Sequence, residues 1–190
     1  MMPQAGQLAS DPTVSLTENT RNIILVGFMG TGKSAVGREL HRLTGFRLVD
    51  VDAEVERAEG MSISDIFDSR GEGAFRDAEA REILRITEGK GQIISTGGGA
   101  VLRQDNMDAL LRSGVVVCLA ASAGTIYKRT KRNKERPLLQ VEDPRGRIEE
   151  MLAERLPYYK KADVTINTEG KSPYEIATEL LEAVGWKSSG

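Results

Sequence analysis

The sequence Gly27-Phe28-Met29-Gly30-Thr31-Gly32-Lys33-Ser34 decides the fold of this chain. A glycine, four further residues and then Gly-Lys-Ser form the pattern of a phosphate-binding loop. The apolar run at 23–26 precedes the loop and predicts a buried strand. Val36, Leu40 and Leu43 follow it at the spacing of one helix face. Strand, loop and helix in this order are the context that the motif requires.

Such a loop binds phosphate because its glycines let successive backbone N–H groups converge on an anion. The helix that follows adds its unsatisfied N–H groups and the positive end of its dipole. Lys33 is expected to reach the β- and γ-phosphates, and the Ser34 hydroxyl to bind Mg²⁺. The alternative is a glycine-rich turn that binds nothing, which the complete motif disfavours. The predicted ATP-binding residues here are Gly30, Thr31, Gly32, Lys33, Ser34 and Ala35.

Length and composition limit the class of protein. The chain has 190 residues, which suits one domain with a sizeable core. A net charge of −2 argues against a general nucleic-acid partner. No apolar run approaches the ~20 residues needed to span a bilayer, and the N-terminus lacks the order of a secretory signal, so no membrane partner is expected. The single cysteine, Cys118, lies in an apolar run and predicts a core residue in a cytoplasmic protein.

Strands and helices alternate along the chain, which indicates a parallel sheet covered on both faces. Expected strands lie at 23–26, 46–52, 92–95, 115–119 and 164–166. Residues 1–20 are predicted to be a disordered tail, and 187–190 a flexible C-terminus. Ser62 and Asp65 predict a helix start, and Ser69 with Glu72 has the spacing of a capping box that opens a helix to about Ile86.

Two carboxylates end the second expected strand. Alternation places Asp50 and Asp52 on the same side of that strand, at the sheet edge where ligands bind in parallel α/β folds. The alternative is that one of them only caps the next helix. Arg76 and Glu79 are three residues apart on a helix and can pair, which by itself is of little consequence.

Three glycines, 97–99, directly follow the third strand. They suit either a ligand that approaches the backbone closely or a plain flexible loop. The basic run at 128–136 allows a solvated loop, a nucleic-acid patch or a lid whose arginines close over a triphosphate; the lid suits a phosphate-loop protein best. Pro144 predicts a helix start, and Ser172 with Glu175 predicts a capping box with Pro173 in the first turn.

Together these segments resemble the shikimate kinase family, which lies in the nucleoside-monophosphate-kinase-like branch of phosphate-loop enzymes. The resemblance covers about 21–186 and includes the phosphate loop, Asp50-Val51-Asp52, Phe75-Arg76, Gly97-Gly98-Gly99, Arg136-Pro137-Leu138-Leu139, and Arg155 with Tyr158-Tyr159. It implies one α/β domain at 21–186, with a five-stranded parallel sheet flanked by helices and a mobile lid at about 130–146. Serine at 95, where many phosphate-loop enzymes carry an aspartate at the end of the third strand, agrees with this family.

The resemblance implies transfer of the ATP γ-phosphoryl group to the 3-hydroxyl of shikimate, with Mg²⁺, by a cytoplasmic monomer. The product is shikimate 3-phosphate, in the pathway to chorismate and aromatic amino acids. The implied catalytic residues are Lys33, Asp52 and Arg136, and Mg²⁺ is held by Ser34 and Asp50. Asp52 binds the substrate's hydroxyls, either as a base or only as a positioning group.

The resemblance also assigns the rest of the site. Arg76 and Arg155 grip the shikimate carboxylate, for which guanidinium forks are suited. The implied substrate-binding residues are Asp52, Phe67, Phe75, Arg76, Gly97, Gly98, Gly99 and Arg155. Arg136 reaches the transferring phosphate from the lid, while Arg129 and the loop that ends at Pro173 contact the nucleotide.

Three alternatives remain at this point. Another small-molecule kinase of the same architecture, such as a gluconate kinase, shares Lys33 and Ser34. A GTP-binding switch is disfavoured because Asn133-Lys134-Glu135-Arg136 ends in arginine where the guanine-recognition motif has aspartate. A degenerate protein that only binds its ligands is disfavoured because no motif position is missing.

Overall fold

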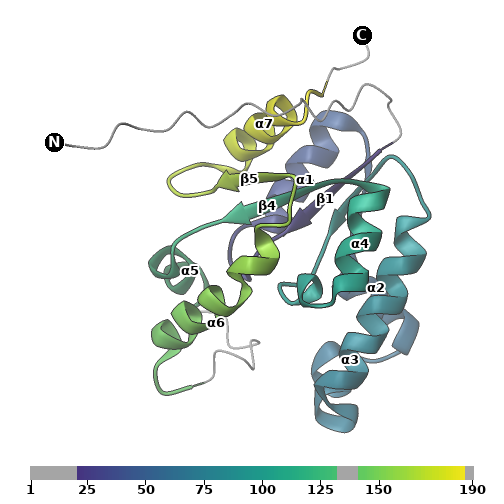
Figure 1. The fold of residues 1–190 in the computed structure, drawn as a ribbon, viewed down its shortest axis with the longest axis vertical. Coiled ribbons are helices and arrows are strands. Elements are labelled where there is room, and N and C mark those ends of the chain that lie inside the picture. The colour runs from purple at the N-terminus through teal and green to yellow at the C-terminus, as the bar shows by residue number, and fades with distance from the viewer. Residues whose placement is uncertain (1–20, 132–140, 187–190) are drawn as a thin grey trace, which may run out of the picture.

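The protein is built on one parallel sheet of five strands (Figure 1). The computed structural model describes residues 21–131 and 141–186. The strands are ordered β2-β3-β1-β4-β5. Their bounds are Asn22–Val26 (β1), Arg47–Asp50 (β2), Gln92–Ser95 (β3), Gly114–Ala120 (β4) and Val164–Asn167 (β5). All four neighbouring pairs are parallel, so the carboxyl ends of the strands meet at one edge.

Helices connect the strands and cover both faces of the sheet (Figure 1). Their bounds are Lys33–Thr44 (α1), Val51–Glu59 (α2), Ile63–Thr87 (α3), Gln104–Ser113 (α4), Ala123–Thr130 (α5), Pro144–Tyr159 (α6) and Pro173–Ala183 (α7), with a short 3₁₀ helix at Ala100–Leu102 (η1). None of the helices in the described ranges combines the length and apolar character that a membrane crossing requires.

Alternation along the strands divides the core into two layers. Ile23 and Leu25 of β1 face the layer under α1 and α7, whose buried residues include Val36 and Leu180. Ile24 and Val26 face the opposite layer, which also takes residues from α2 to α6. Both layers are continuous and apolar, as expected for a parallel sheet buried on both faces.

Most of the expected elements are confirmed. The fold is the predicted five-stranded α/β class, and the predicted strand at 92–95 has the observed bounds of β3. Ser62 caps α3 through the Asp65 N–H. The capping box predicted for the last helix, Ser172 with Glu175, is present in α7.

The predicted capping box at Ser69 is wrong. Helix α3 does consist of two stretches, one that begins at Ile63 and one that continues to Thr87, but the Ser69 hydroxyl donates back to the Asp65 carbonyl in the first stretch. The break falls at Gly71, whose φ of 83° and ψ of 170° are not helical. Because only glycine adopts such a backbone readily, the glycine sets the break and the serine stays in the preceding turn.

The placement of the two aspartates also needs a correction. Strand β2 ends at Asp50 and α2 begins at Val51, so Asp52 lies in the first turn of a helix and not on a strand. Asp50 is the N-cap of α2, because its side chain accepts from the N–H groups of Asp52 and Ala53. The capping alternative therefore applies to Asp50, although both carboxylates still face one pocket.

Candidate active site

The phosphate loop joins β1 to α1 and is packed too closely for side chains at two of its glycines. Gly27 has a φ of +137°, and a Cβ there would lie 2.4 Å from the Leu119 carbonyl oxygen. Gly30 has a φ of +78°, and a Cβ there would lie 2.7 Å from Cγ2 of Thr130. Both positions therefore require glycine, because the loop curls tightly against β4 and α5.

Lys33 lies inside this curl. Its Nζ donates to the carbonyl oxygens of Gly27 at 2.7 Å and Phe28 at 3.0 Å, and the side chain is buried. These bonds hold a positive charge at the first turn of α1, where the helix dipole is also positive. The two features together favour an anion at the mouth of the loop.

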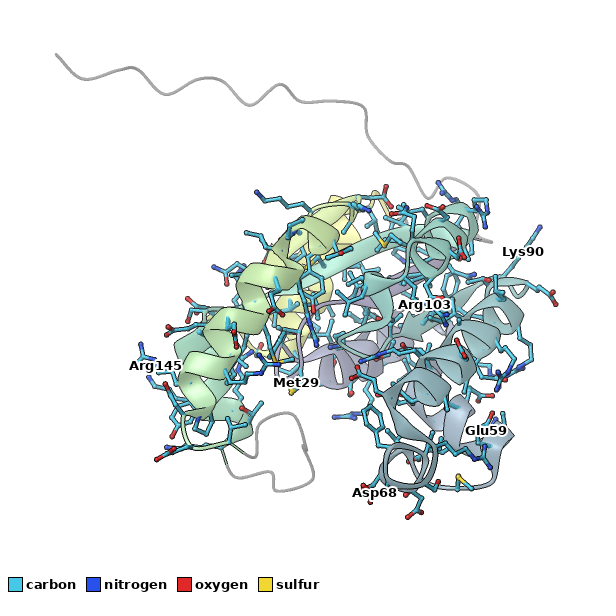
Figure 2. The ribbon with its side chains drawn as sticks, turned by 60° about the horizontal axis from the view of Figure 1, so that its bottom comes forward. Met29, Glu59, Asp68, Lys90, Arg103 and Arg145 are labelled. Carbon is cyan, nitrogen blue, oxygen red and sulfur yellow. The ribbon has the colours of Figure 1, made fainter. Side chains whose placement is uncertain are left out.

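A pocket of about 410 Å³ opens beside the loop. It is lined by Met29, Gly30, Gly32, Lys33, Ser34, Ala35, Arg38, Asp50, Asp52, Ser95, Thr96, Gly97, Gly98 and Arg129. Figure 2 shows Met29 between the α6 side of the molecule and the α3 side. The structure thus brings the phosphate loop, both predicted carboxylates and two of the three predicted glycines into one cavity. Such convergence of polar groups is typical of a ligand site.

Asp52 has an unusual protonation behaviour in this pocket. Burial, and then the negative charges of Glu79 and Asp50, raise its pKa to about 6 from the ordinary 3.8, although Lys33 and Arg76 oppose this. Its Oδ1 is buried and has no hydrogen-bond partner among the described residues. A carboxylate with such a pKa and an unused oxygen can accept a proton from a bound hydroxyl near neutral pH.

Ser34 and Asp50 carry oxygen atoms of the kind that coordinate a magnesium ion. Both line the pocket, Ser34 at the start of α1 and Asp50 at the end of β2. The described residues contain no group of three or more carboxylate, histidine or cysteine side chains that could hold a metal. Mg²⁺ bound with nucleotide phosphates commonly uses one or two protein oxygens and several waters, so this small donor set fits it.

The predicted pair of Arg76 and Glu79 forms, and its Glu79 side is buried, unlike the solvated pair that spacing alone suggests. Arg76 donates to Glu79 at 2.9 Å, and the Glu79 side chain is 0% exposed. Burial raises the pKa of Glu79, while Arg76 lowers it. The second oxygen of Glu79 has no partner among the described residues, and a Cβ on Gly97 would lie within 2.9 Å of it and of Asp52 Oδ1.

Both predicted clamp arginines lie against the glycine loop. Arg155 of α6 donates to the Gly98 carbonyl at 3.1 Å. A Cβ on Gly99 would lie 2.6 Å from the Arg76 guanidinium. Two guanidinium groups thus flank one short loop, an arrangement that suits a bound carboxylate or phosphate. The pocket lining includes Gly98 but not its neighbours Gly99, Arg76 and Arg155. These three residues therefore lie next to the pocket and not in its wall.

Aromatic rings support the arginines. The rings of Phe67 and Phe75 are 5.1 Å apart, and Arg76 lies 5.0 Å from the Phe75 centroid. Arg155 lies 5.4 Å from the Phe28 centroid, a cation–π contact that the sequence did not suggest. These contacts restrict the motion of both guanidinium groups, because each is attracted to the face of a ring.

Arg129 connects the phosphate loop to the segment after β5. It donates to the carbonyl oxygens of Gly30 and Thr168, and to the Thr168 hydroxyl. Pro173, at the start of α7, does not line the pocket, so the structure does not bring it together with the loop. Arg136 and most of the predicted lid lie outside the described residues, as do the tail at 1–20 and the end at 187–190.

Sequence reasoning gave no role to several residues that the structure places here. Arg38, Ser95 and Thr96 line the pocket, and Tyr159 donates to the Gly98 carbonyl at 2.7 Å. Two signals were available for Tyr159: it belongs to the segment of Arg155 with Tyr158-Tyr159 that carries the family resemblance, and its position four residues after Arg155 puts both side chains on the same face of α6.

A phosphate loop after the central strand of a parallel sheet with this order defines a phosphate-loop phosphotransferase of the nucleoside-monophosphate-kinase type. The arginines beside the loop indicate a second, anionic substrate. A family model described as shikimate kinase matches residues 29–185, which is more than half of the chain. The chain belongs to the shikimate kinase family, and it is thus a kinase whose family transfers phosphate to shikimate.

Individual relatives agree with this assignment. The shikimate kinase of Thermodesulfovibrio yellowstonii is 49% identical over 170 residues, which cover 90% of this chain and 98% of that protein. That of Persephonella marina is 47% identical over 161 residues, covering 85% and 97%. A solved shikimate kinase from Acinetobacter baumannii, in complex with shikimate, is 39% identical with a TM-score of 0.83, covering 86% of this chain and 92% of that one.

Proposed function

We propose that this chain transfers the γ-phosphoryl group of ATP to the 3-hydroxyl of shikimate, giving shikimate 3-phosphate and ADP. One observation carries the proposal: the glycine loop is shared by two neighbouring sites. Gly97 and Gly98 line the phosphate-loop pocket, while Gly98 and Gly99 contact the two arginines. A donor and an anionic acceptor on either side of this loop would lie close enough for direct transfer.

The phosphate loop is proposed to bind ATP through the N–H groups of residues 30–35. Lys33 would turn from the carbonyls of Gly27 and Phe28 toward the β- and γ-phosphates, where its charge offsets the charge that develops during transfer. The burial of Lys33 supports this role, since a charge is most effective where water is excluded.

Ser34 and Asp50 are proposed to hold Mg²⁺ with the nucleotide, Ser34 directly and Asp50 through water. Asp50 is suited to a water-mediated contact because one of its oxygens already accepts from the N–H groups of Asp52 and Ala53. When bound, the ion would neutralise charge on the phosphate oxygens.

Asp52 is proposed to bind the acceptor hydroxyl and take its proton. The ionised form is needed for this task, and a pKa of about 6 leaves Asp52 ionised at neutral pH while keeping it basic enough to accept a proton. Its unpaired Oδ1 supports the assignment, because a buried carboxylate oxygen without a partner is costly unless a ligand supplies one.

The acceptor's carboxylate is proposed to lie between Arg76 and Arg155, with N–H groups of the glycine loop nearby. Phe67 and Phe75 would form an apolar wall next to Arg76. This set would distinguish shikimate from gluconate by a rigid ring that fits between the wall and the loop.

The remaining roles rest on the resemblance. Arg136 is proposed to contact the transferring phosphate from a lid at about 130–146, so Arg136→Ala should mainly lower kcat. Arg129 and the segment up to Pro173 are proposed to contact the nucleotide, which the bonds from Arg129 to Gly30 and Thr168 support.

A monomer in the cytoplasm is also proposed, and sedimentation of the purified protein tests the monomeric state.

A coupled assay tests the function directly. ADP release from ATP and Mg²⁺ should depend on shikimate, with gluconate giving little or no turnover. GTP should replace ATP poorly. Turnover that is no faster with shikimate than without it would overturn the proposal, and preferred turnover of gluconate would replace it with the rival kinase.

A further inference from the structure

The carbonyl oxygen of Gly98 is held by two side chains of α6. Tyr159 donates its hydroxyl at 2.7 Å, and Arg155 donates from Nη1 at 3.1 Å. Both residues are buried, at 6% and 7% exposure. They are four residues apart and therefore lie one helical turn from each other on the same face. Helix α6 thus fixes one peptide group of the glycine loop from a single side.

Fixing that carbonyl also fixes the direction of the Gly99 N–H. The described residues contain no cis peptide bond, and in a trans peptide the C=O and the following N–H point in opposite directions. The Gly99 N–H therefore points away from the Tyr159 hydroxyl. No described residue accepts a hydrogen bond from the N–H groups of Gly97, Gly98 or Gly99. Gly97 and Gly98 line the pocket, and Gly99 is buried beside Arg76, so its N–H is an unused donor next to that guanidinium.

Arg76 lies against the same peptide group. A Cβ on Gly99 would lie 2.6 to 2.7 Å from three atoms of the Arg76 guanidinium, so this cation is adjacent to the Gly99 backbone. Arg103 further fixes the position of this part of α3, because it donates to the Arg76 carbonyl and pairs with Asp77. An anion that reaches Arg76 can thus meet a neighbouring N–H donor.

We propose that Tyr159 is a positioning residue for the acceptor: it holds the Gly98–Gly99 peptide so that the Gly99 N–H and Arg76 bind the same carboxylate. The inference rests on the proposed function and adds to it a residue that touches neither substrate. Without the Tyr159 hydroxyl, Arg155 alone holds the carbonyl, and the peptide between two glycines is held less firmly.

Tyr159 is suited to this task at every working pH. Burial raises the pKa of its hydroxyl to about 12, so the group remains a donor and does not become a competing anion. Arg155 also binds the Gly98 carbonyl, but it uses only one of its five N–H donors there. Its other donors can therefore bind a ligand while Tyr159 and Nη1 hold the carbonyl.

The test is Tyr159→Phe, assayed with shikimate and with its methyl ester. Removing one hydrogen bond should raise the KM for shikimate about 3- to 10-fold, while the KM for ATP stays within about twofold. With the ester, which carries no carboxylate charge, the variant and the parent should have nearly equal KM values. A purely structural role would weaken both acceptors alike.

Tyr158→Phe is the matched control. The neighbouring Tyr158 is partly buried, and its hydroxyl has no hydrogen-bond partner among the described residues, so this variant should retain both KM values. Tyr159→4-aminophenylalanine restores an N–H donor on the same ring and should recover most of the parent's KM for shikimate. It also provides the measurement if Tyr159→Phe does not fold.

The outcomes separate this inference from the proposed function. A parent protein that does not phosphorylate shikimate would overturn both. An active parent would overturn this inference alone if Tyr159→Phe kept the parent's KM for shikimate. This inference alone would also be overturned if Tyr159→Phe raised the KM for the methyl ester as much as the KM for shikimate. It would likewise be overturned if the folded 4-aminophenylalanine variant had a KM for shikimate as high as that of Tyr159→Phe.

Discussion

The phosphate-binding part and the acceptor-binding part of the site are built in different ways. The first is one continuous segment whose backbone makes the binding surface, with Gly27 and Gly30 enforced by contacts to β4 and α5. The second is assembled from α3, the loop after β3 and α6; Arg155 and Gly98, for example, meet across 57 positions of sequence. The phosphate-binding part is a local unit of the sequence, whereas the acceptor-binding part depends on packing between distant segments.

This difference predicts which kinetic constant changes when a residue of each part is substituted. The phosphate-binding part acts on the transferring group, so damage to it should lower kcat. The acceptor-binding part depends on side chains held by other side chains, as Glu79 holds Arg76. Damage there should raise the KM for shikimate and leave the KM for ATP nearly unchanged.

The largest effect is expected for Lys33→Ala. Loss of a buried charge at the phosphates should lower kcat roughly 10³-fold in the coupled assay. Lys90→Ala is the matched control, since Lys90 is exposed and lies before β3, at the amino end of the sheet. Retention of most activity by the Lys33 variant would mean that the phosphate-binding part does not act through this charge.

Asp52→Asn should lower kcat/KM roughly 10²-fold or more, because the amide cannot accept the proton. In the parent, activity should fall as the pH drops through about 6, where Asp52 becomes protonated. A parent pH profile that stays flat from pH 8 to pH 5 would contradict the assignment of Asp52 as the proton acceptor.

The same variant should be more stable than the parent at pH 7.5. The folded pKa of Asp52 lies above its ordinary 3.8, so the fold favours the protonated form, and the cost of ionisation is complete above about pH 6. Asparagine removes that cost, on the order of 3 kcal/mol for a shift of about two pKa units. Thermal midpoints should differ at pH 7.5 and converge near pH 4; a difference that grows on acidification would contradict this account.

Arg76→Ala should raise the KM for shikimate roughly 10- to 100-fold, because it removes a charge-assisted contact to the carboxylate. It should also lower the thermal midpoint, since it leaves Glu79 buried without its partner. The double variant Arg76→Ala, Glu79→Gln should regain stability but keep the high KM, which separates the two effects.

Arg81→Ala is the control for Arg76, because Arg81 lies on the same helix and pairs with Glu59 in a largely exposed position. Its kinetic constants should match those of the parent. An equal rise in the KM values for ATP and shikimate in Arg76→Ala would argue against a clamp that serves the acceptor alone.

The smallest effect is expected for Gly99→Ala. The new methyl group would meet the Arg76 guanidinium at 2.6 Å, and relieving this contact requires only that the end of the Arg76 side chain shifts slightly against Glu79 and Phe75. The KM for shikimate should rise about 3- to 10-fold, as for the loss of one hydrogen bond. Gly124→Ala, where the nearest atom would lie at 4.0 Å, should change nothing; the same result for Gly99→Ala would show that Arg76 acts elsewhere.

The sequence by itself determined the fold class and the phosphate-binding part. A strand, a glycine loop and a helix are local, so residues 23–43 are enough to recognise this unit, although contacts to Leu119 and Thr130 add the requirement for glycine at 27 and 30. The capping box at Ser172 was predictable for the same reason, whereas at 69–72 the sequence predicted a second helix start but not that Gly71, and not a Ser69 cap, makes the break.

Only the tertiary structure decided how the acceptor-binding part is assembled. Spacing predicted the pair of Arg76 and Glu79 but not its burial, which depends on the packing of α3 against the rest of the molecule. Nothing near Tyr159 in sequence indicates that its hydroxyl meets Gly98. Such contacts join segments far apart in the chain, and they exist only because the parallel sheet brings the ends of its strands to one edge.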